Sequence, residues 1–470
     1  MTHQDRSLND RYDLTKSQVL LNGTQALVRL MLMQKARDVA VGLNTAGYVT
    51  GYRGSPLGAV DMQMDRAAKP LAEAGVIFQL GLNEDLAATA LWGTQQAELR
   101  GEGTHDGMFG LWYGKGPGVD RSSDVMRHAN MAGTSRHGGV IMAMGDDHTG
   151  ESSTSLHQSD FHMVEAYMPI VSPAGVQEVL DLGLYAYALS RFSGCWVGLK
   201  TMKDTIEVTS VVDGDPHRAR FVEPDIEMPD GGLNIRLIDT PVDQEARVID
   251  HKRAAAEAFA RANRIDNAVW PNKNARIGFV AAGKNWLDLV HALSLLGINE
   301  DEGARLGIST YKIAQVWPLD VTSFNEWAKG LDLIVVVEEK RKLIEGQIKE
   351  ALFDDPHRAR VYGARKGATE LFPIRYALDP ILIAQKLGGI LTEEGCVSDA
   401  VTAGIAKIND AVRADDAPDL AARTPYFCSG CPHNSLTKVP IGSRAYSGIG
   451  CHYLVQWMER DTLGSTHMGG

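Results

Sequence analysis

The stretch Gly139-Val140-Ile141-Met142-Ala143-Met144 indicates the fold class of this chain. It leads directly into the polar turn Gly145-Asp146-Asp147-His148. A short, continuous apolar run that ends in glycine and acidic residues is typical of a strand buried on both faces. Strands of this kind belong to parallel sheets, whose two faces are covered by helices. The stretch therefore predicts an α/β protein.

The same alternation of strand and helix continues on both sides of this stretch. Further strands are predicted at 48–52, 76–80, 107–111 and 195–200, the last closing the sheet, with a turn at 115–118. Helices are predicted at 24–37, 83–90, 125–132 and 176–190. Asn22 or Thr24 is expected to cap the first helix and Asn83 the second. Repeated alternation of this type predicts one parallel sheet flanked by helices.

Composition changes divide the rest of the chain. The first domain is expected at 1–212, followed at 213–274 by a connector that includes a polar helix, 243–263. A second α/β unit is expected at 275–415, with strands at 276–283 and 333–337 and helices at 286–296 and 399–413. The run Glu338-Glu339-Lys340 is expected to be a strand end with a solvated face. A linker at 415–418 precedes a last segment, 416–470.

Composition and charge limit the possible functions. The chain has 470 residues, of which 44 % are hydrophobic and 23 % charged, and these values are typical of a globular α/β protein. A net charge of −12 without a basic run argues against a nucleic-acid partner. The N-terminus has no apolar core of a signal peptide, and no apolar run approaches the roughly 20 residues of a membrane span. Five unevenly spaced cysteines favour the reducing cytoplasm.

Three of the five cysteines lie close to the end of the chain, as Cys428-Ser429-Gly430-Cys431 and Cys451. Thiolates at this spacing can converge on an iron–sulfur cluster, or on zinc with His433 or His452 as the fourth ligand. Cys195 and Cys396 are expected to be buried or incidental thiols. The chain stops at Gly469-Gly470, and we expect it to be cut inside a domain.

Several motifs together resemble the thiamine-diphosphate-dependent 2-oxoacid:ferredoxin oxidoreductases, and in particular the long fused bacterial indolepyruvate ferredoxin oxidoreductases. The motifs are Gly51-Tyr52-Arg53-Gly54-Ser55-Pro56, Asn83-Glu84, Gly145–His148, Phe427–Asn434, Gly448–His452 and Thr466–Gly470. The resemblance implies a pyrimidine-binding domain at 1–212, a transketolase-C-like domain at 275–415 and the start of a diphosphate-binding domain at 416–470. It also implies parallel sheets of the thiamine-diphosphate-binding type.

The resemblance assigns roles to individual residues. Glu84 matches the glutamate that hydrogen-bonds the aminopyrimidine of thiamine diphosphate, and Ser55 matches a residue that contacts the substrate carboxylate. Arg136 lies near the place of a substrate-stabilising arginine. Cys428, Cys431 and Cys451 match three ligands of a [4Fe–4S] cluster, and Gly54, Gly450 and His452 are expected to contact the cofactor. From the residues alone, Glu84 could instead complement a helix dipole, Arg136 could be a solvated loop residue, and His148 and His157 are expected to be solvated or hydrogen-bonded.

The activity implied by the resemblance is oxidative decarboxylation of a 2-oxoacid, such as indolepyruvate or another arylpyruvate, to an acyl-CoA. The implied cofactors are thiamine diphosphate, Mg²⁺ and the [4Fe–4S] cluster, with coenzyme A as co-substrate and ferredoxin as electron acceptor. The implied assembly is a homodimer or a complex with a partner chain, because the chain stops before the acidic magnesium-binding segment and the fourth cysteine of its relatives. The alternatives are a non-redox thiamine-dependent decarboxylase or carboligase and a non-catalytic subunit.

Overall fold

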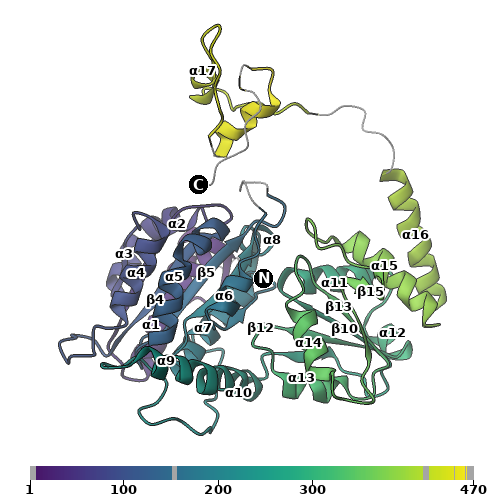
Figure 1. Ribbon diagram of the computed structural model, residues 1–470, viewed down its shortest axis with the longest axis horizontal. Helices are drawn as coiled ribbons and strands as arrows, with labels where there is room; N and C mark the ends of the chain where they lie inside the picture. The colour runs from purple at the N-terminus through teal and green to yellow at the C-terminus, as the bar shows by residue number, and fades with distance from the viewer. Residues whose placement is uncertain (1–6, 151–155, 416–422, 449, 461, 463–470) are drawn as a thin grey trace.

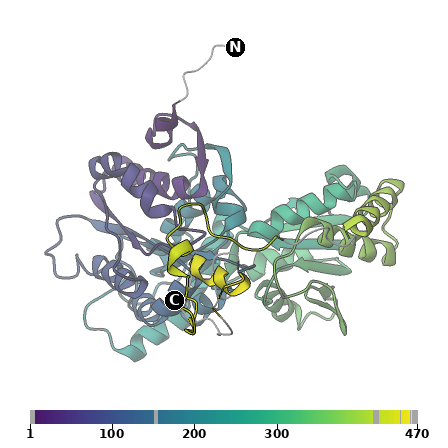
Figure 2. The same cartoon turned by 90° about the horizontal axis from the view of Figure 1, so that it is seen from above.

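The computed structural model describes residues 7–150, 156–415, 423–448, 450–460 and 462. Figure 1 and Figure 2 both show two α/β units side by side, the first in purple to blue and the second in green. Each unit is built around a sheet that consists mostly of parallel strands and is flanked by helices. The prediction of an α/β fold with parallel sheets is therefore confirmed.

The first unit contains a seven-stranded sheet in the order β12-β6-β7-β5-β4-β2-β3. Its parallel strands are β2 (Thr45–Gly51), β3 (Val76–Phe78), β4 (Gly107–Lys115), β5 (Val140–Asp146), β6 (Ile170–Val171) and β7 (Val197–Met202). Its helices are α1 (Gly23–Ala40), α2 (Val60–Arg66), α3 (Ala68–Glu73), α4 (Glu84–Thr94), α5 (Gly116–Ala132), α6 (Asp160–Glu165), α7 (Val176–Ser193) and α8 (Lys203–Ile206).

Local sequence determines where the first helices begin. The Asn22 side chain accepts a hydrogen bond from the Gln25 amide at 2.9 Å, and the Gln25 side chain accepts one in return from the Asn22 amide, so Asn22 is the predicted cap. Asn83 caps α4 through the Leu86 amide at 2.9 Å, also as predicted. The predicted turn at 115–118 is wrong: Gly116 opens helix α5 directly after β4.

The second unit contains a five-stranded sheet in the order β14-β13-β10-β11-β9. The strands are β9 (Asn267–Trp270), β10 (Ile277–Ala282), β11 (Ile308–Ile313), β13 (Leu333–Val337) and β14 (Arg360–Tyr362), with a small hairpin of β15 (Arg365–Lys366) and β16 (Thr369–Glu370). The helices are α11 (Gly283–Leu295), α12 (Glu300–Arg305), α13 (Val321–Ala328), α14 (Ile344–Leu352), α15 (Pro380–Glu393) and α16 (Asp399–Asp415).

One strand crosses from the second unit to the first. β12 (Gln315–Trp317) follows β11 in the chain but pairs antiparallel with β6. It therefore forms the edge of the seven-stranded sheet, and the prediction that residues 195–200 close that sheet is wrong. The Ser172 amide also donates to the Ala314 carbonyl at 2.8 Å. The two units are thus joined by main-chain hydrogen bonds as well as by the connecting chain.

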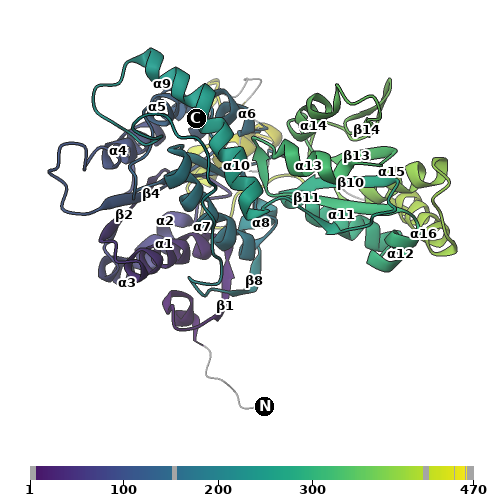
Figure 3. The same cartoon turned by 90° about the horizontal axis from the view of Figure 1, so that it is seen from below.

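The range 213–274 is more than a connector. β8 (Thr209–Asp213) pairs with β1 (Gln18–Asn22) just before it. α9 (Pro241–Arg247), a π-helical turn (Val248–Lys252) and α10 (Arg253–Asn263) then run along the first unit, as Figure 3 shows. Ala255, Ala256 and Phe259 of α10 are buried in the core of the first unit. The predicted domain boundaries themselves remain predictions.

Among its described residues, the C-terminal segment contains the short helix α17 (His433–Leu436) and a 3₁₀ helix (Gly450–Trp457). Figure 1 shows it apart from both sheets, in yellow. Residues 416–418 of the predicted linker and the motif Thr466–Gly470 lie outside the described residues. Within the described part of the chain, no helix is both long and apolar enough to span a bilayer.

Candidate functional site

The carboxyl ends of β2, β4 and β5 meet at one edge of the first sheet, where open α/β sheets bind ligands. The turn after β2 holds Gly54 and the exposed Ser55. A Cβ atom at Gly54 would come within 2.7 Å of the Lys115 side chain, at the end of β4. A Cβ atom at Gly145, near the end of β5, would come within 3.0 Å of Pro56. The turn after β2 therefore lies against the ends of both neighbouring strands.

Glu84 lies at the same edge, as the first residue of α4. Its carbonyl accepts a hydrogen bond from Trp112 Nε1 at 3.0 Å, which ties the start of α4 to β4. Its side chain is half-buried against the first turn of α5, where a Cβ at Gly118 would lie 2.7 Å from Glu84 Cγ and 3.0 Å from Glu84 Oε1. The glycine at 118 thus leaves room for this carboxylate.

The Glu84 carboxylate has no hydrogen bond or ion pair with any of the residues that the structure describes. Its neighbour Asp85, by contrast, is paired with Arg121 at 2.8 Å. A half-buried carboxylate without a partner, next to a glycine-lined turn, fits the role of a group that hydrogen-bonds a polar heterocycle such as the aminopyrimidine of thiamine diphosphate. The structure thus brings together Glu84, Gly54 and Ser55 along one edge.

Arg136 is not part of this edge. It is exposed and lies between α5 and β5, next to His137, whose carbonyl carbon would lie 2.5 Å from a Cβ at Gly107. Gly107 is the first residue of β4, whereas Lys115 is its last. At about 3.3 Å per residue, β4 separates the two edges by about 26 Å. The prediction that Arg136 joins Glu84 and Ser55 is therefore not supported within one chain.

A second group of polar residues lies close to Glu84. The Asp120 carboxylate of α5 contacts His157 Nε2 at 2.9 Å and His162 Nε2 at 2.7 Å. His162 Nδ1 lies 3.2 Å from Ser123 Oγ. Burial alone would raise the pKa of Asp120, but the hydrogen bonds from the two histidines hold it well below its usual range. The hydrogen bond to Asp120 also raises the pKa of His162.

The sequence predicted that the run Glu338-Glu339-Lys340 is a solvated face. This prediction is wrong, because Glu339 and Lys340 are buried. Glu339 is 5 % and Lys340 8 % exposed, and both face the first unit. His148, which is 3 % exposed, makes a short Nδ1 contact with Glu339, and Lys340 donates to the His148 carbonyl. The sequence could not reveal this pairing because the two partners of the contact are 191 residues apart.

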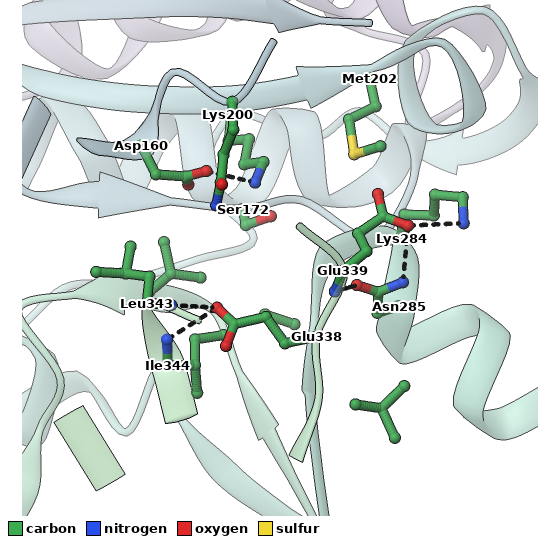
Figure 4. A pocket seen from close by; sticks show the side chains of 14 residues that line it. Asp160, Ser172, Lys200, Met202, Lys284, Asn285, Glu338, Glu339, Leu343 and Ile344 are labelled. Atoms are coloured by element: carbon green, nitrogen blue, oxygen red, sulfur yellow. Dashed lines mark hydrogen bonds and ion pairs between the residues drawn. The ribbon is translucent and has the colours of Figure 1, made fainter. Parts of the chain in front are cut away.

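The other Glu339 oxygen accepts hydrogen bonds from the Leu378 amide at 3.0 Å, Asn285 Nδ2 at 3.3 Å and Lys284 Nζ at 3.4 Å. Figure 4 shows this carboxylate beside Lys284 and Asn285, at a cavity of about 40 Å³. Burial would raise the pKa of Glu339, yet His148 and Lys284 bring it down to about 2. Burial would lower the pKa of His148, but the Asp146 carboxylate, 3.8 Å from Nε2, and the contact of Nδ1 with Glu339 raise it. We call His148, Glu339, Lys284 and Lys340 the junction cluster.

The neighbouring Glu338 has a different environment. Its carboxylate accepts hydrogen bonds from the main-chain amides of Leu343, Ile344 and Glu345 at 2.9, 2.8 and 3.1 Å, as Figure 4 shows for the first two. Burial raises the pKa of Glu338 to about 7 despite these three bonds. Two adjacent carboxylates therefore have their pKa values shifted in opposite directions by their surroundings.

The predicted cluster ligands lie in the C-terminal segment. Cys431 Sγ lies 3.2 Å from His433 Nδ1, and the rings of His433 and His452 are stacked with centroids 5.6 Å apart. Cys428 and Cys451 are exposed, as is Gly450, which adopts a φ of 68°. Among the residues that are described, no three His, Cys, Asp or Glu side chains are placed to hold a metal ion. The structure therefore does not assemble the predicted cluster site.

Comparison with known proteins adds independent information. Residues 267–415 match the family model described as an indolepyruvate oxidoreductase domain. The chain is 23 % identical over 470 residues to indolepyruvate oxidoreductase subunit IorA of Pyrococcus abyssi, covering 98 % of this chain and 65 % of the relative. It is 22 % identical over 420 residues to the protein of the same name from Methanothermobacter marburgensis, covering 87 % of this chain and 59 % of the relative.

The fold is similar to that of a 2-oxoglutarate:ferredoxin oxidoreductase from Magnetococcus marinus, with a TM-score of 0.55 and 13 % sequence identity. That match covers 80 % of this chain and 65 % of the other. The chain spans about 59–65 % of the length of the two curated relatives described here. The chain is therefore similar in sequence to indolepyruvate oxidoreductase subunits along most of its length, its residues 267–415 match the indolepyruvate oxidoreductase domain, and its fold is similar to that of a 2-oxoacid:ferredoxin oxidoreductase.

Proposed function

We propose that this chain contributes the thiamine-diphosphate-dependent half of a reaction that oxidatively decarboxylates an arylpyruvate, with indolepyruvate as the first candidate. Coenzyme A is the proposed acyl acceptor and ferredoxin the proposed electron acceptor. The single observation that carries the proposal is the unpartnered Glu84 carboxylate beside Gly118, at the ligand-binding edge of the sheet. The names of the relatives support the choice of substrate class.

Thiamine diphosphate, when bound with Mg²⁺, supplies a carbon nucleophile for the keto carbon of a 2-oxoacid and later accommodates its electrons. Glu84 is proposed to exchange a proton with the aminopyrimidine ring. Gly54 is proposed to allow close approach of the cofactor, and Ser55 to donate a hydrogen bond to the substrate carboxylate. Each of these roles belongs to side chains or backbone at the edge described above.

Cys428, Cys431 and Cys451 are proposed to supply thiolates to a [4Fe–4S] cluster, with Gly450 and His452 close to the cofactor. The support is the chemistry of the donors, since thiolates are the usual ligands of such clusters. A homodimer or a partner chain is proposed to complete the site. The cytoplasm is the proposed location, because the thiolates must remain reduced.

Glu84→Gln tests the proposal, with Asp85→Asn as a matched control from the same helical turn. Indolepyruvate-dependent reduction of ferredoxin would be measured anaerobically, with coenzyme A present, and thiamine diphosphate binding by calorimetry. We expect Glu84→Gln to lower turnover by roughly 10²–10⁴-fold, the usual contribution of a positioned proton-transfer group. Asp85→Asn should leave turnover within about threefold, because Asp85 contacts Arg121 instead. Turnover of Glu84→Gln within about threefold of the unaltered protein would refute the proposal.

A further inference from the structure

Two histidines share the Asp120 carboxylate, but their second ring nitrogens differ. His162 has a partner at both nitrogens, Asp120 at Nε2 and Ser123 at Nδ1. His157 contacts Asp120 through Nε2, whereas its Nδ1 is buried and has no hydrogen-bond partner among the described residues. A buried polar atom without a partner is unfavourable, because its hydrogen bonds to water are lost and not replaced. The nitrogen therefore requires a partner that the described residues do not provide.

The position of His157 connects it to the Glu84 edge. A Cβ at Gly116 would lie 2.4 Å from His157 Nδ1, so the ring lies directly over the first residue of α5. Two residues further along, Gly118 contacts Glu84. Because consecutive Cα atoms are 3.80 Å apart, the Cα atoms of Gly116 and Gly118 are separated by at most about 7.6 Å. His157 and Glu84 therefore both lie against the first turn of α5.

The surroundings of His157 Nδ1 suit an anionic or polar oxygen. Asp120 contacts Nε2 at 2.9 Å and so fixes the orientation of the ring, and Nδ1 is a donor when both ring nitrogens carry a proton. The ring lies at the N-terminal end of a 17-residue helix, where Lys115, the N-cap residue, makes no side-chain cap hydrogen bond. The first amides of α5 favour negative charge at this position.

We propose that His157, oriented by Asp120, is a substrate-binding residue whose Nδ1 donates a hydrogen bond to an oxygen of the bound 2-oxoacid. The inference rests on the proposed function, because it places His157 in the same site as Glu84. His162 then has the separate role of holding Asp120 in place. The 2-oxoacid offers two kinds of acceptor to His157, the carboxylate and the keto oxygen.

Calorimetric binding of two probes to the full chain, loaded with thiamine diphosphate and Mg²⁺, tests this inference without requiring turnover. Phenylpyruvate carries both a carboxylate and a keto oxygen, and 3-phenylpropionate carries the carboxylate alone. For His157→Gln we expect roughly 10–100-fold weaker binding of phenylpyruvate, since hydrogen bonds to charged groups contribute about this much. His137→Gln is the matched control, with an expected change below about threefold, because His137 lies beside Gly107 at the opposite end of β4. A parallel loss for 3-phenylpropionate assigns the carboxylate as acceptor, and a loss for phenylpyruvate alone assigns the keto oxygen.

Gly116→Ala provides a second variant in case His157→Gln fails to fold. The added methyl group would displace the His157 ring and should weaken phenylpyruvate binding to a similar extent. In addition, the ¹⁵N resonance of His157 Nδ1 should shift when phenylpyruvate binds, while that of His162 should not. Equal affinity of the unaltered chain and both variants would overturn the inference and leave a bound water as the partner of Nδ1. Absence of 2-oxoacid binding by the unaltered chain would instead overturn the proposed function and this inference together.

Discussion

Replacing Glu339 by glutamine is expected to destabilise the chain by about 3–5 kcal/mol at pH 5.5, the usual cost of removing one partner of a buried ion pair. Glu339 contacts His148 through one oxygen and accepts three hydrogen bonds through the other. Glutamine preserves the shape but offers a single acceptor oxygen, so the charged interactions with His148 and Lys284 are lost together. Because a typical domain is stable by 5–15 kcal/mol, the loss is a large fraction of the total.

The pH dependence follows from the directions of the two pKa shifts. Glu339 has a lowered pKa, so its contribution is present above about pH 4.5 and is lost as the pH falls towards 2. His148 has a raised pKa, so its contribution is complete below about pH 6.5 and is lost as the pH rises through the folded-state value. The difference between the variant and the unaltered chain should therefore be largest between about pH 4.5 and 6.5.

Glu338→Gln is the matched control, because it changes the adjacent residue in the same way. Glu338 has a raised pKa, so its carboxylate favours folding at low pH and opposes it once ionised. Glutamine keeps an acceptor for the Leu343 and Ile344 amides but loses the bond from the Glu345 amide. At pH 8 the stability lost with that hydrogen bond and the stability gained by removing a buried charge should nearly cancel.

The free energy of unfolding of both variants would be measured by urea titration at pH 5.5 and pH 8. Unfolding would be followed by tryptophan fluorescence and by far-ultraviolet circular dichroism. For Glu339→Gln we expect the two signals to separate into two transitions, because the junction cluster links the two α/β units. A Glu339→Gln variant that unfolds within about 1 kcal/mol of the unaltered chain at pH 5.5 would refute this reasoning. The same conclusion would follow if the two glutamine variants behaved alike.

Two further predictions concern Asp266 and Cys431. Burial raises the pKa of Asp266 to about 7 although Ala314 and Gln315 amides donate to it, so stability should fall by about 1.4 kcal/mol per pH unit between pH 5 and 7. Asp266→Asn should remove this slope in urea titrations, and an unchanged slope would contradict the assignment. Cys431→Ser should lower the iron bound after anaerobic reconstitution, measured by visible absorbance and metal analysis, whereas Cys195→Ser, a change in the buried core, should not. A colourless, zinc-containing protein would favour the zinc alternative.

Much of the local structure could be predicted because it depends on neighbouring residues. Asn22 and Asn83 cap their helices with side chains that reach only three residues along the chain. The continuous apolar run at 140–144 indicated a strand buried on both faces, and all of β5 is buried. The start of α5 was missed because Gly116-Pro117-Gly118 is typical of a turn, although proline is also favoured in the first helical turn.

The tertiary structure decided which charged residues are buried and which of them meet. Nothing near Glu339 in the sequence indicates that His148 of the other unit covers it, and the crossing of β12 into the first sheet depends on the same packing. Arg136 precedes β5, whereas Glu84 follows β3. In a parallel sheet, residues before the strands and residues after them lie at opposite edges, so the two side chains are far apart. The sequence alone determined the buried strands β2, β4, β5, β7, β10 and β13, the two asparagine caps and the family motifs, since these depend on short-range periodicity and hydrogen bonding. The environment of Glu84, the Asp120–His157 contact and the junction cluster depend on long-range packing, which no short window of sequence contains.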